Sequence, residues 1–260
     1  MAHRPRLWRR LLAEFVGTGF LAAVVVGSGI AAEALSTDTG LQLLESAAAT
    51  AAALVALILA LGPVSGGHLN PVVTAVDAVF GGLAPREVPG YVAAQVSGAV
   101  SGAVVANLMF ELPAVAWSDT ARSGGGLWLA EVVATVGLVV VIFGVVRSGR
   151  TSAAPFAVGA YIGAAYFFTA STSFANPALS VGRMFTDTFA GIAPSSVAPF
   201  VAFQLVGGAL AVALVRALYP DIATAAAEVI VPGLDSGADR DPHGNGAART
   251  DHSRTGGLSP

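Results

Sequence analysis

The chain has 260 residues, of which 55% are hydrophobic and 11% are charged, and its net charge is −3. Soluble globular domains carry about 25% charged residues, so this composition excludes a soluble globule and indicates an integral membrane protein. All 13 basic residues are arginine, and they form no basic face, which excludes a nucleic-acid-binding protein. Without cysteine, the chain can form neither disulfides nor thiolate metal sites.

Six apolar segments are long enough to cross a membrane, which takes roughly 20 residues in a helix. They cover residues 8–32, 41–64, 87–110, 127–147, 152–170 and 196–218. These segments are apolar on all sides, whereas the strands of a membrane β-barrel would alternate. The sequence therefore predicts an all-α membrane protein with six transmembrane helices.

The arginines predict the orientation of these spans. With a cytoplasmic N-terminus, eight arginines fall on the cytoplasmic side and only Arg122 and Arg183 on the outside, as the positive-inside rule requires. Both termini are then cytoplasmic, and residues 219–260, rich in Asp, Gly, Pro, His and Arg, are expected to form a disordered tail. The abundance of Ala, Val, Gly and Arg without lysine favours a bacterial source, and hence the inner membrane.

The chain repeats itself in two halves, 1–110 and 111–218. Three anchors recur in the same order: Ala13-Glu14 as Ala130-Glu131, Asn70-Pro71 as Asn176-Pro177, and Gln95 as Gln204. Because each half holds three spans, the second half enters the membrane from the opposite side. The result is an inverted three-helix repeat.

Each half also contains a broken span. Asn before Pro is a favourable helix start, and half-helices are predicted over 70–81 and 176–188. About ten residues rise about 15 Å, half of the hydrocarbon core. The preceding connectors cannot face lipid, so they line a wet cavity, where the helix dipoles and Asn amides repel cations. The predicted pore centre comprises Asn70, Pro71, Val72, Asn176, Pro177 and Ala178.

These motifs resemble the aquaporin and glycerol-facilitator family, the major intrinsic proteins, over about residues 7–218. The resemblance rests on Ala13-Glu14-Phe15, on Ser65-Gly66-Gly67-His68-Leu69-Asn70-Pro71 and on Phe174-Ala175-Asn176-Pro177-Ala178. It implies a homotetramer in the lipid membrane, with one pore per subunit for water or small neutral solutes. It also implies that connector carbonyls line the pore, at Gly66, Gly67, His68, Ser173, Phe174 and Ala175. Glu14 and Glu131 would hold the connectors, with Gln95 and Gln204 as further hydrogen-bond donors.

The selectivity filter departs from the family. Where the family usually has an arginine, three residues after the second motif asparagine, this chain has Leu179. The other filter positions, carried over by their distance from each asparagine, are Thr50, Ala164 and Ser173. Such a filter would be wide and weakly polar. The chain is similar around 171–174 and 186–192 to bacterial members associated with arsenic resistance, which implies passage of glycerol, arsenous acid or organoarsenicals.

Arg183 leaves an alternative open. It lies one helical turn after Leu179, so it either reaches back and makes a water-selective constriction or pairs with Asp187 or a neighbouring loop.

A coupled transporter would need ionisable residues in the core, and only Glu14 and Glu131 are available. No catalytic residue, metal site or cofactor is expected. His68 is expected to act through its carbonyl rather than as a pH gate, and Asp77 to be a solvated residue at the pore mouth.

Overall fold

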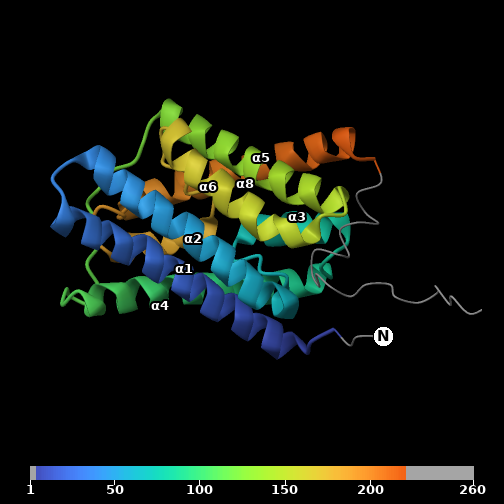
Figure 1. Cartoon of the computed structure of the whole chain (residues 1–260), viewed down its shortest axis with the longest axis horizontal. Helices are drawn as coiled ribbons and strands as arrows, with labels where there is room; N and C mark the ends of the chain where they lie inside the picture. The colour runs from blue at the N-terminus through green and yellow to red at the C-terminus, as the bar shows by residue number, and fades with distance from the viewer. Residues whose placement is uncertain (1–3, 221–260) are drawn as a thin grey trace, which may run out of the picture.

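The computed structural model describes residues 4–220, and every regular element within that range is helical. Figure 1 shows an elongated bundle in which the long helices run roughly parallel to one another. The expected tail from residue 221 onward lies outside the described residues. The elements are α1 (Leu7–Leu35), α2 (Thr39–Ser65), α3 (Pro71–Phe80), η1 (Pro85–Glu87), α4 (Val88–Met109), α5 (Gly125–Arg147), η2 (Thr151–Ala153), α6 (Ala154–Phe168), α7 (Pro177–Gly182), η3 (Arg183–Phe185) and α8 (Pro194–Leu218).

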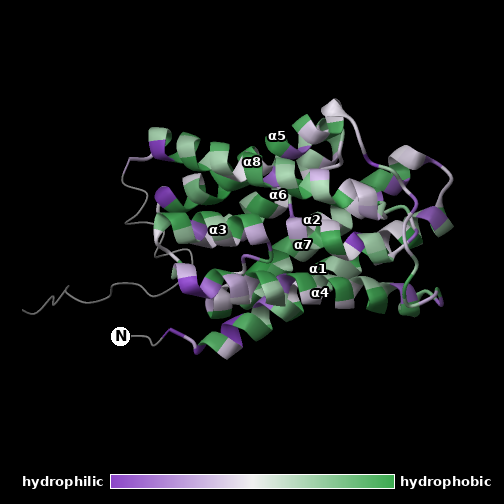
Figure 2. Cartoon of the chain, turned by 180° about the vertical axis from the view of Figure 1, so that it is seen from behind, coloured by the Kyte–Doolittle hydropathy of each residue, from purple (hydrophilic) through white to green (hydrophobic). Residues whose placement is uncertain are grey.

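Five helices of the described part are long and apolar enough to span a membrane: α1, α2, α4 with η1, α5 and α8. The sixth predicted span corresponds to α6, which has 15 residues and is preceded by the 3-10 turn η2. The helix ends at Phe168, two residues short of the predicted boundary, and Thr169 after it is extended. Figure 2 shows hydrophobic residues along the middle of the bundle and hydrophilic residues concentrated towards its two ends, as a multi-pass membrane protein requires.

The helices pack in two corresponding sets. In the first half α1 packs against α2 and α4, and in the second half α5 packs against α6 and α8. The halves meet where α2 contacts α6, and each half-helix packs against the last long helix of the other half, α3 on α8 and α7 on α4. Because each half-helix contacts the other half of the chain, the two half-helices lie between the repeats.

The first half-helix, α3, has the bounds that the sequence predicts, between caps at Asn70 and Gly81. For the second half-helix the predicted end at 188 is wrong, because α7 and η3 end at Phe185. The reason is tertiary: the carbonyls of Met184 and Phe185 accept hydrogen bonds from Ser118 N and Ala116 N in the α4–α5 loop, at 3.1 Å each. Those acceptors are therefore not used for a further helical turn.

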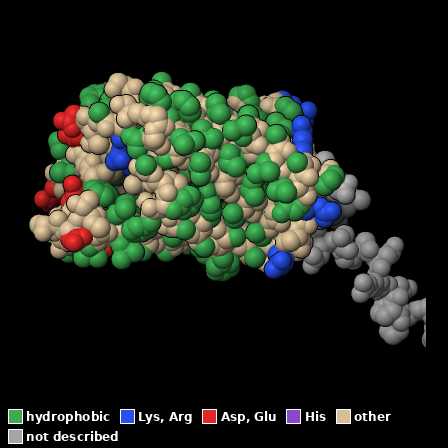
Figure 3. Space-filling model, turned by 90° about the horizontal axis from the view of Figure 1, so that it is seen from above, with side chains coloured by type: hydrophobic (Ala, Val, Ile, Leu, Met, Phe, Trp, Pro, Cys, Tyr) green, Lys and Arg blue, Asp and Glu red, His purple; other side chains and the backbone are tan. Residues whose placement is uncertain are grey.

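Charged residues separate towards the two ends of the bundle. Figure 3 shows the acidic side chains gathered at one end and most arginines at the other. We call the first the acidic end, where Glu33, Asp38, Glu111 and Asp119 are exposed, and the second the basic end. The basic end exposes Arg4, Arg6, Arg86, Arg147 and Arg150. The two ends of the bundle therefore differ in electrostatic potential.

The closest helix crossing, α1 on α4, depends on glycine. A Cβ added at Gly102 would lie 2.0 Å from the carbonyl oxygen of Gly19, and one at Gly98 would lie 2.3 Å from that of Phe15. Both obstacles are backbone atoms, which cannot rotate away. Small residues at such crossings let helix backbones touch, which supplies packing energy that lipid cannot replace.

Gly102→Ala should therefore destabilise the protein by about 1–3 kcal/mol or more, because one added methyl group forces α1 and α4 apart. The measurement is thermal unfolding of the purified protein in detergent. Gly125→Ala is the matched control, since a Cβ there meets nothing within 4 Å. Equal unfolding temperatures for the two variants would contradict the close crossing.

Candidate functional site

The two half-helices meet at their N-termini through the motif asparagines. Asn70 caps α3 by accepting a hydrogen bond from Val72 N at 2.9 Å, and Asn176 caps α7 by accepting from Ala178 N at 3.0 Å. Pro71 and Pro177 occupy the first helical positions, where the missing N–H has no cost. The asparagine side chains thus fix both helix starts at one level.

Each asparagine also binds the connector of the opposite half. Asn70 Nδ2 donates to the carbonyl of Ala175 at 2.7 Å, and Asn176 Nδ2 donates to the carbonyl of Leu69 at 2.8 Å. Both asparagines are 5% exposed. These reciprocal bonds join two segments that are more than 100 residues apart in sequence and hold both positive helix ends towards the cavity.

The connectors adopt backbone conformations that need external support. Leu69, Thr172, Ser173 and Ala175 have φ between 44° and 59°, and Gly66 and Gly67 also have positive φ. Residues other than glycine rarely adopt this left-handed region, and each such residue is held there by its surroundings. The peptide groups consequently point away from the usual helical partners.

Two buried carboxylates accept the N–H groups of these connectors. Glu14 accepts from His68 N at 3.0 Å and from Leu69 N at 2.7 Å. Glu131 accepts from Phe174 N at 3.0 Å and from Ala175 N at 2.8 Å. Both glutamates are fully buried.

Two glutamines complete the same arrangement in each half. Gln95 Nε2 donates to Glu14 at 2.7 Å and to Thr74 of α3 at 2.9 Å. Gln204 Nε2 donates to Glu131 at 2.6 Å and to Ser180 of α7 at 3.0 Å. Each glutamine therefore ties a connector carboxylate to the half-helix that comes after it.

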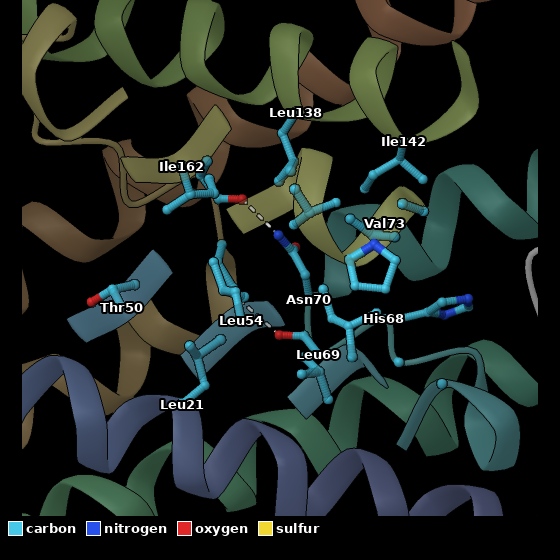
Figure 4. A pocket seen from close by; sticks show the side chains of 18 of the residues that line it. Leu21, Thr50, Leu54, His68, Leu69, Asn70, Val73, Leu138, Ile142 and Ile162 are labelled. Atoms are coloured by element: carbon cyan, nitrogen blue, oxygen red, sulfur yellow. Dashed lines mark hydrogen bonds between the residues drawn. The ribbon is translucent and has the colours of Figure 1, made fainter. Parts of the chain in front are cut away.

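A cavity of about 260 Å³ runs between the repeats, past both motif asparagines. Figure 4 shows Asn70 near its middle, with Thr50 on one side and His68 on the other. The lining reaches Arg183 towards the acidic end and Thr151 and Ser152 towards the basic end. Most of the lumen between them is apolar, and its lining includes Leu21, Val25, Leu54, Val73, Leu138, Ile142 and Ile162.

The mouth at the acidic end contains most of the predicted filter residues. Thr50, Ser173, Leu179 and Arg183 all line the cavity and are buried. The expectation for Ala164 is wrong, because this residue is exposed on the outside of α6 and does not line the cavity. Tyr166 lines the cavity in its place and approaches Thr50, with 3.1 Å between the two hydroxyl oxygens.

The register of α6 explains that error. Ile162 and Tyr166 are four residues apart, on one helix face, and both line the cavity. Ala164 lies two residues from each of them, which turns its side chain to the opposite face. The distance counted back from Asn176 runs through the irregular connector, where residue number does not track helical rise. The four-residue spacing of Ile162 and Tyr166 within α6 was the one feature of the sequence from which the cavity-facing side of this helix could have been predicted.

Arg183 reaches the cavity and, of the two partners expected for it, binds the neighbouring loop and not Asp187. Its Nε donates to the carbonyl of Ala190, and its guanidinium carbon lies 3.5 Å from the centre of the Phe174 ring. Asp187 instead accepts a hydrogen bond from Asp119 N at 3.3 Å. The arginine is 5% exposed, so a fixed positive charge lies in the mouth, one helical turn beyond Leu179.

At the basic end the expectation for Asp77 is wrong, because its side chain is fully buried. Its Oδ2 lies 3.5 Å from His68 Nε2, and His68 Nδ1 lies 3.1 Å from Thr74 Oγ1. His68 lines the cavity, while its ring is packed 5.5 Å from that of Tyr91. The one feature of the sequence that could have indicated the His68–Asp77 pair is that an acidic residue lies on the predicted half-helix.

A membrane-spanning cavity between two opposed half-helices is the structure of a transmembrane channel. Residues 1–190 match the major intrinsic protein family, and the chain belongs to this family. Its members are channels, and this chain is a passive membrane channel for water and small solutes.

Individual relatives agree with this assignment. The chain is 50% identical to the aquaglyceroporin AqpS of Rhizobium meliloti (strain 1021) over 210 residues, which are 81% of this chain and 90% of that protein. It is 30% identical to aquaporin NIP1-3 of Oryza sativa subsp. japonica over 217 residues, 80% of this chain and 74% of that protein. In structure it resembles the aquaglyceroporin of Plasmodium falciparum, with a TM-score of 0.68 at 20% identity, covering 85% of this chain and all of that one.

Glu131→Gln tests the support of the second connector. A glutamine amide places an NH2 group against backbone N–H donors, so at least one buried donor loses its acceptor, and the protein should lose about 1–3 kcal/mol of stability. Water permeability per folded molecule should also fall. Both are measured on purified protein, by thermal unfolding and in proteoliposomes, with the exposed Glu111→Gln as control. A Glu131→Gln protein that matches the control in both assays would contradict this support.

Proposed function

We propose that the mouth at the acidic end is the selectivity filter, and that it admits uncharged solutes of glycerol size, such as glycerol or arsenous acid. One observation carries this proposal: Leu179 lines the cavity where the family usually has arginine, alongside the hydroxyl-bearing Thr50, Tyr166 and Ser173. Solutes of this kind carry hydroxyl groups on a small framework. A mouth lined by hydroxyl groups and one apolar side chain can bind such solutes without a fixed charge at the level of Leu179.

Ser173 adds a free binding group to this filter. Its Oγ is buried and has no hydrogen-bond partner among the described residues, and the residue lines the cavity. Buried polar atoms are normally paired, so we infer that this hydroxyl turns towards a solute hydroxyl when one occupies the filter. Beyond the filter the apolar lumen disfavours ions, since charged groups lose their hydration there.

Charge exclusion comes from three fixed features. The N-termini of α3 and α7 direct positive dipole ends at the cavity centre, the amides of Asn70 and Asn176 lie beside them, and Arg183 adds a full charge at the mouth. All three repel cations. Glu14 and Glu131 are each occupied by several donors, which supports connector holding rather than proton coupling. We therefore infer a channel, and neither a coupled transporter nor an enzyme.

Leu179→Arg tests the filter. The substitution narrows the mouth and adds a second fixed charge, so glycerol permeability should fall at least tenfold while water permeability falls only a few-fold. Stopped-flow light scattering on proteoliposomes measures both, with uptake of arsenous acid as a third solute. Leu179→Met, which keeps an apolar side chain of similar volume, is the matched control.

The outcomes separate the alternatives. Equal loss of glycerol and water flux would refute the filter assignment. Water flux without glycerol flux in the native protein would support the water-selective alternative, in which Arg183 constricts the pore; Arg183→Leu should then open it to glycerol. Saturable flux that depends on an ion gradient would indicate a transporter.

We further infer that four copies assemble in a bacterial inner membrane, with both termini in the cytoplasm and residues 1–110 and 111–218 as the two repeats. The family resemblance supports the tetramer, and the arginine-rich basic end supports the orientation. Native mass spectrometry from mild detergent should give a species of four times 25.9 kDa. A monomer that retains full permeability in proteoliposomes would contradict this assembly.

A further inference from the structure

We propose that Arg122 is a positioning residue for the filter: it holds Arg183 in the mouth by binding the loop to which Arg183 is anchored. This inference rests on the proposed filter. Arg122 belongs to the loop between α4 and α5, outside both sequence motifs, and it does not line the cavity. Any effect on selectivity must therefore pass through another residue.

The contacts of Arg122 and Arg183 interleave on three consecutive residues. Arg122 Nε donates to the carbonyl of Gly191 at 2.9 Å, and its Nη2 donates to the carbonyl of Phe189 at 3.2 Å. The carbonyl between them, on Ala190, accepts from Arg183 Nε. Arg122 therefore fixes the peptide groups on both sides of the one that Arg183 binds.

Both guanidinium groups also lie against one aromatic ring. The guanidinium carbon of Arg183 is 3.5 Å from the Phe174 ring centre, and that of Arg122 is 5.3 Å from it. Phe174 belongs to the second connector, and Glu131 holds its backbone N–H. Cation–π contacts of this kind strengthen where water is excluded, so the ring links both arginines to the connector.

The loop that carries Arg122 is itself fixed over the mouth. Arg122 N donates to Ser196 Oγ at 3.0 Å, and Ala193 N donates to Thr120 O at 2.8 Å. Gly191 leaves no room for a side chain, because an added Cβ would lie 2.4 Å from Ser118 Oγ. The backbone that carries the Arg122 side chain is therefore held in place by its own contacts. Loss of this side chain would free the carbonyls of Phe189 and Gly191 while the rest of the loop stays bound.

The experiment is a double-mutant cycle read out as the ratio of glycerol to water permeability in proteoliposomes. The variants are Arg122→Gln, Arg122→Lys, Arg183→Leu and the combinations of each Arg122 change with Arg183→Leu. We expect Arg183→Leu to raise the ratio, because the mouth loses its guanidinium. Arg122→Gln should raise it at least twofold in the native background and leave it unchanged in the Arg183→Leu background.

Arg122→Lys distinguishes geometry from charge. A lysine keeps the charge but not the planar fork that binds two carbonyls at once, so it should restore only part of the native ratio. If Arg122→Gln does not fold, the lysine variant carries the test alone, with a raised ratio that disappears in the Arg183→Leu background. Arg6→Gln, an exposed arginine at the basic end, controls for the loss of one charge.

Each failure has a separate signature. Arg183→Leu without any effect on the ratio would show that Arg183 does not shape the filter and would overturn this inference, whereas the filter assignment itself stands or falls with Leu179→Arg. If Arg183→Leu raises the ratio but changes at Arg122 leave it alone, or act equally in both backgrounds, only the positioning role is overturned. Equal loss of water and glycerol flux on changing Arg122 would show that the residue merely supports the fold.

Discussion

The pore depends on two buried carboxylates that accept backbone N–H groups. A membrane offers no water to unpaired peptide groups, so a non-helical connector can enter it only if the protein supplies every partner. Glu14 and Glu131 supply those partners to segments whose φ angles are positive at residues other than glycine. Because the carboxylates lie on α1 and α5, the first helix of each repeat determines where the cavity forms. The asparagine caps then add the link between repeats.

The sequence predicted the parts of this arrangement that depend on local rules and on repetition. Asn before Pro fixed the start of each half-helix, and the paired acids and glutamines indicated the support of the connectors. These features are readable because each depends on residue type at a fixed position of a repeated unit. The bounds of α3 were predictable for the same reason, since its last residue precedes a glycine that ends the helix at φ 89°.

The errors fall where a distant segment decides the outcome. The second half-helix ends at Phe185 because the α4–α5 loop takes its last carbonyls, and nothing within 176–188 encodes that contact. Ala164 was misplaced because its position was counted through a connector of irregular geometry. Asp77 is buried beside the connector histidine, because α3 packs between the two repeats. Arg122 carried no signal in the sequence, since a lone loop arginine is usually solvated.

The two mouths show how the two ends of a pore built from an inverted repeat come to differ. The connectors, caps, acids and glutamines occur in both halves, so they give a symmetric pore centre and no preference between sides. The halves differ in the segment that comes after each half-helix. After α3 the chain enters η1 and α4 within a few residues, and His68 and Asp77 are buried on this side of the asparagines. After η3 a longer loop returns across the mouth, and the loop between α4 and α5 binds it through Arg122. Selectivity can therefore change through these unrepeated loops while the symmetric centre, on which folding depends, stays intact.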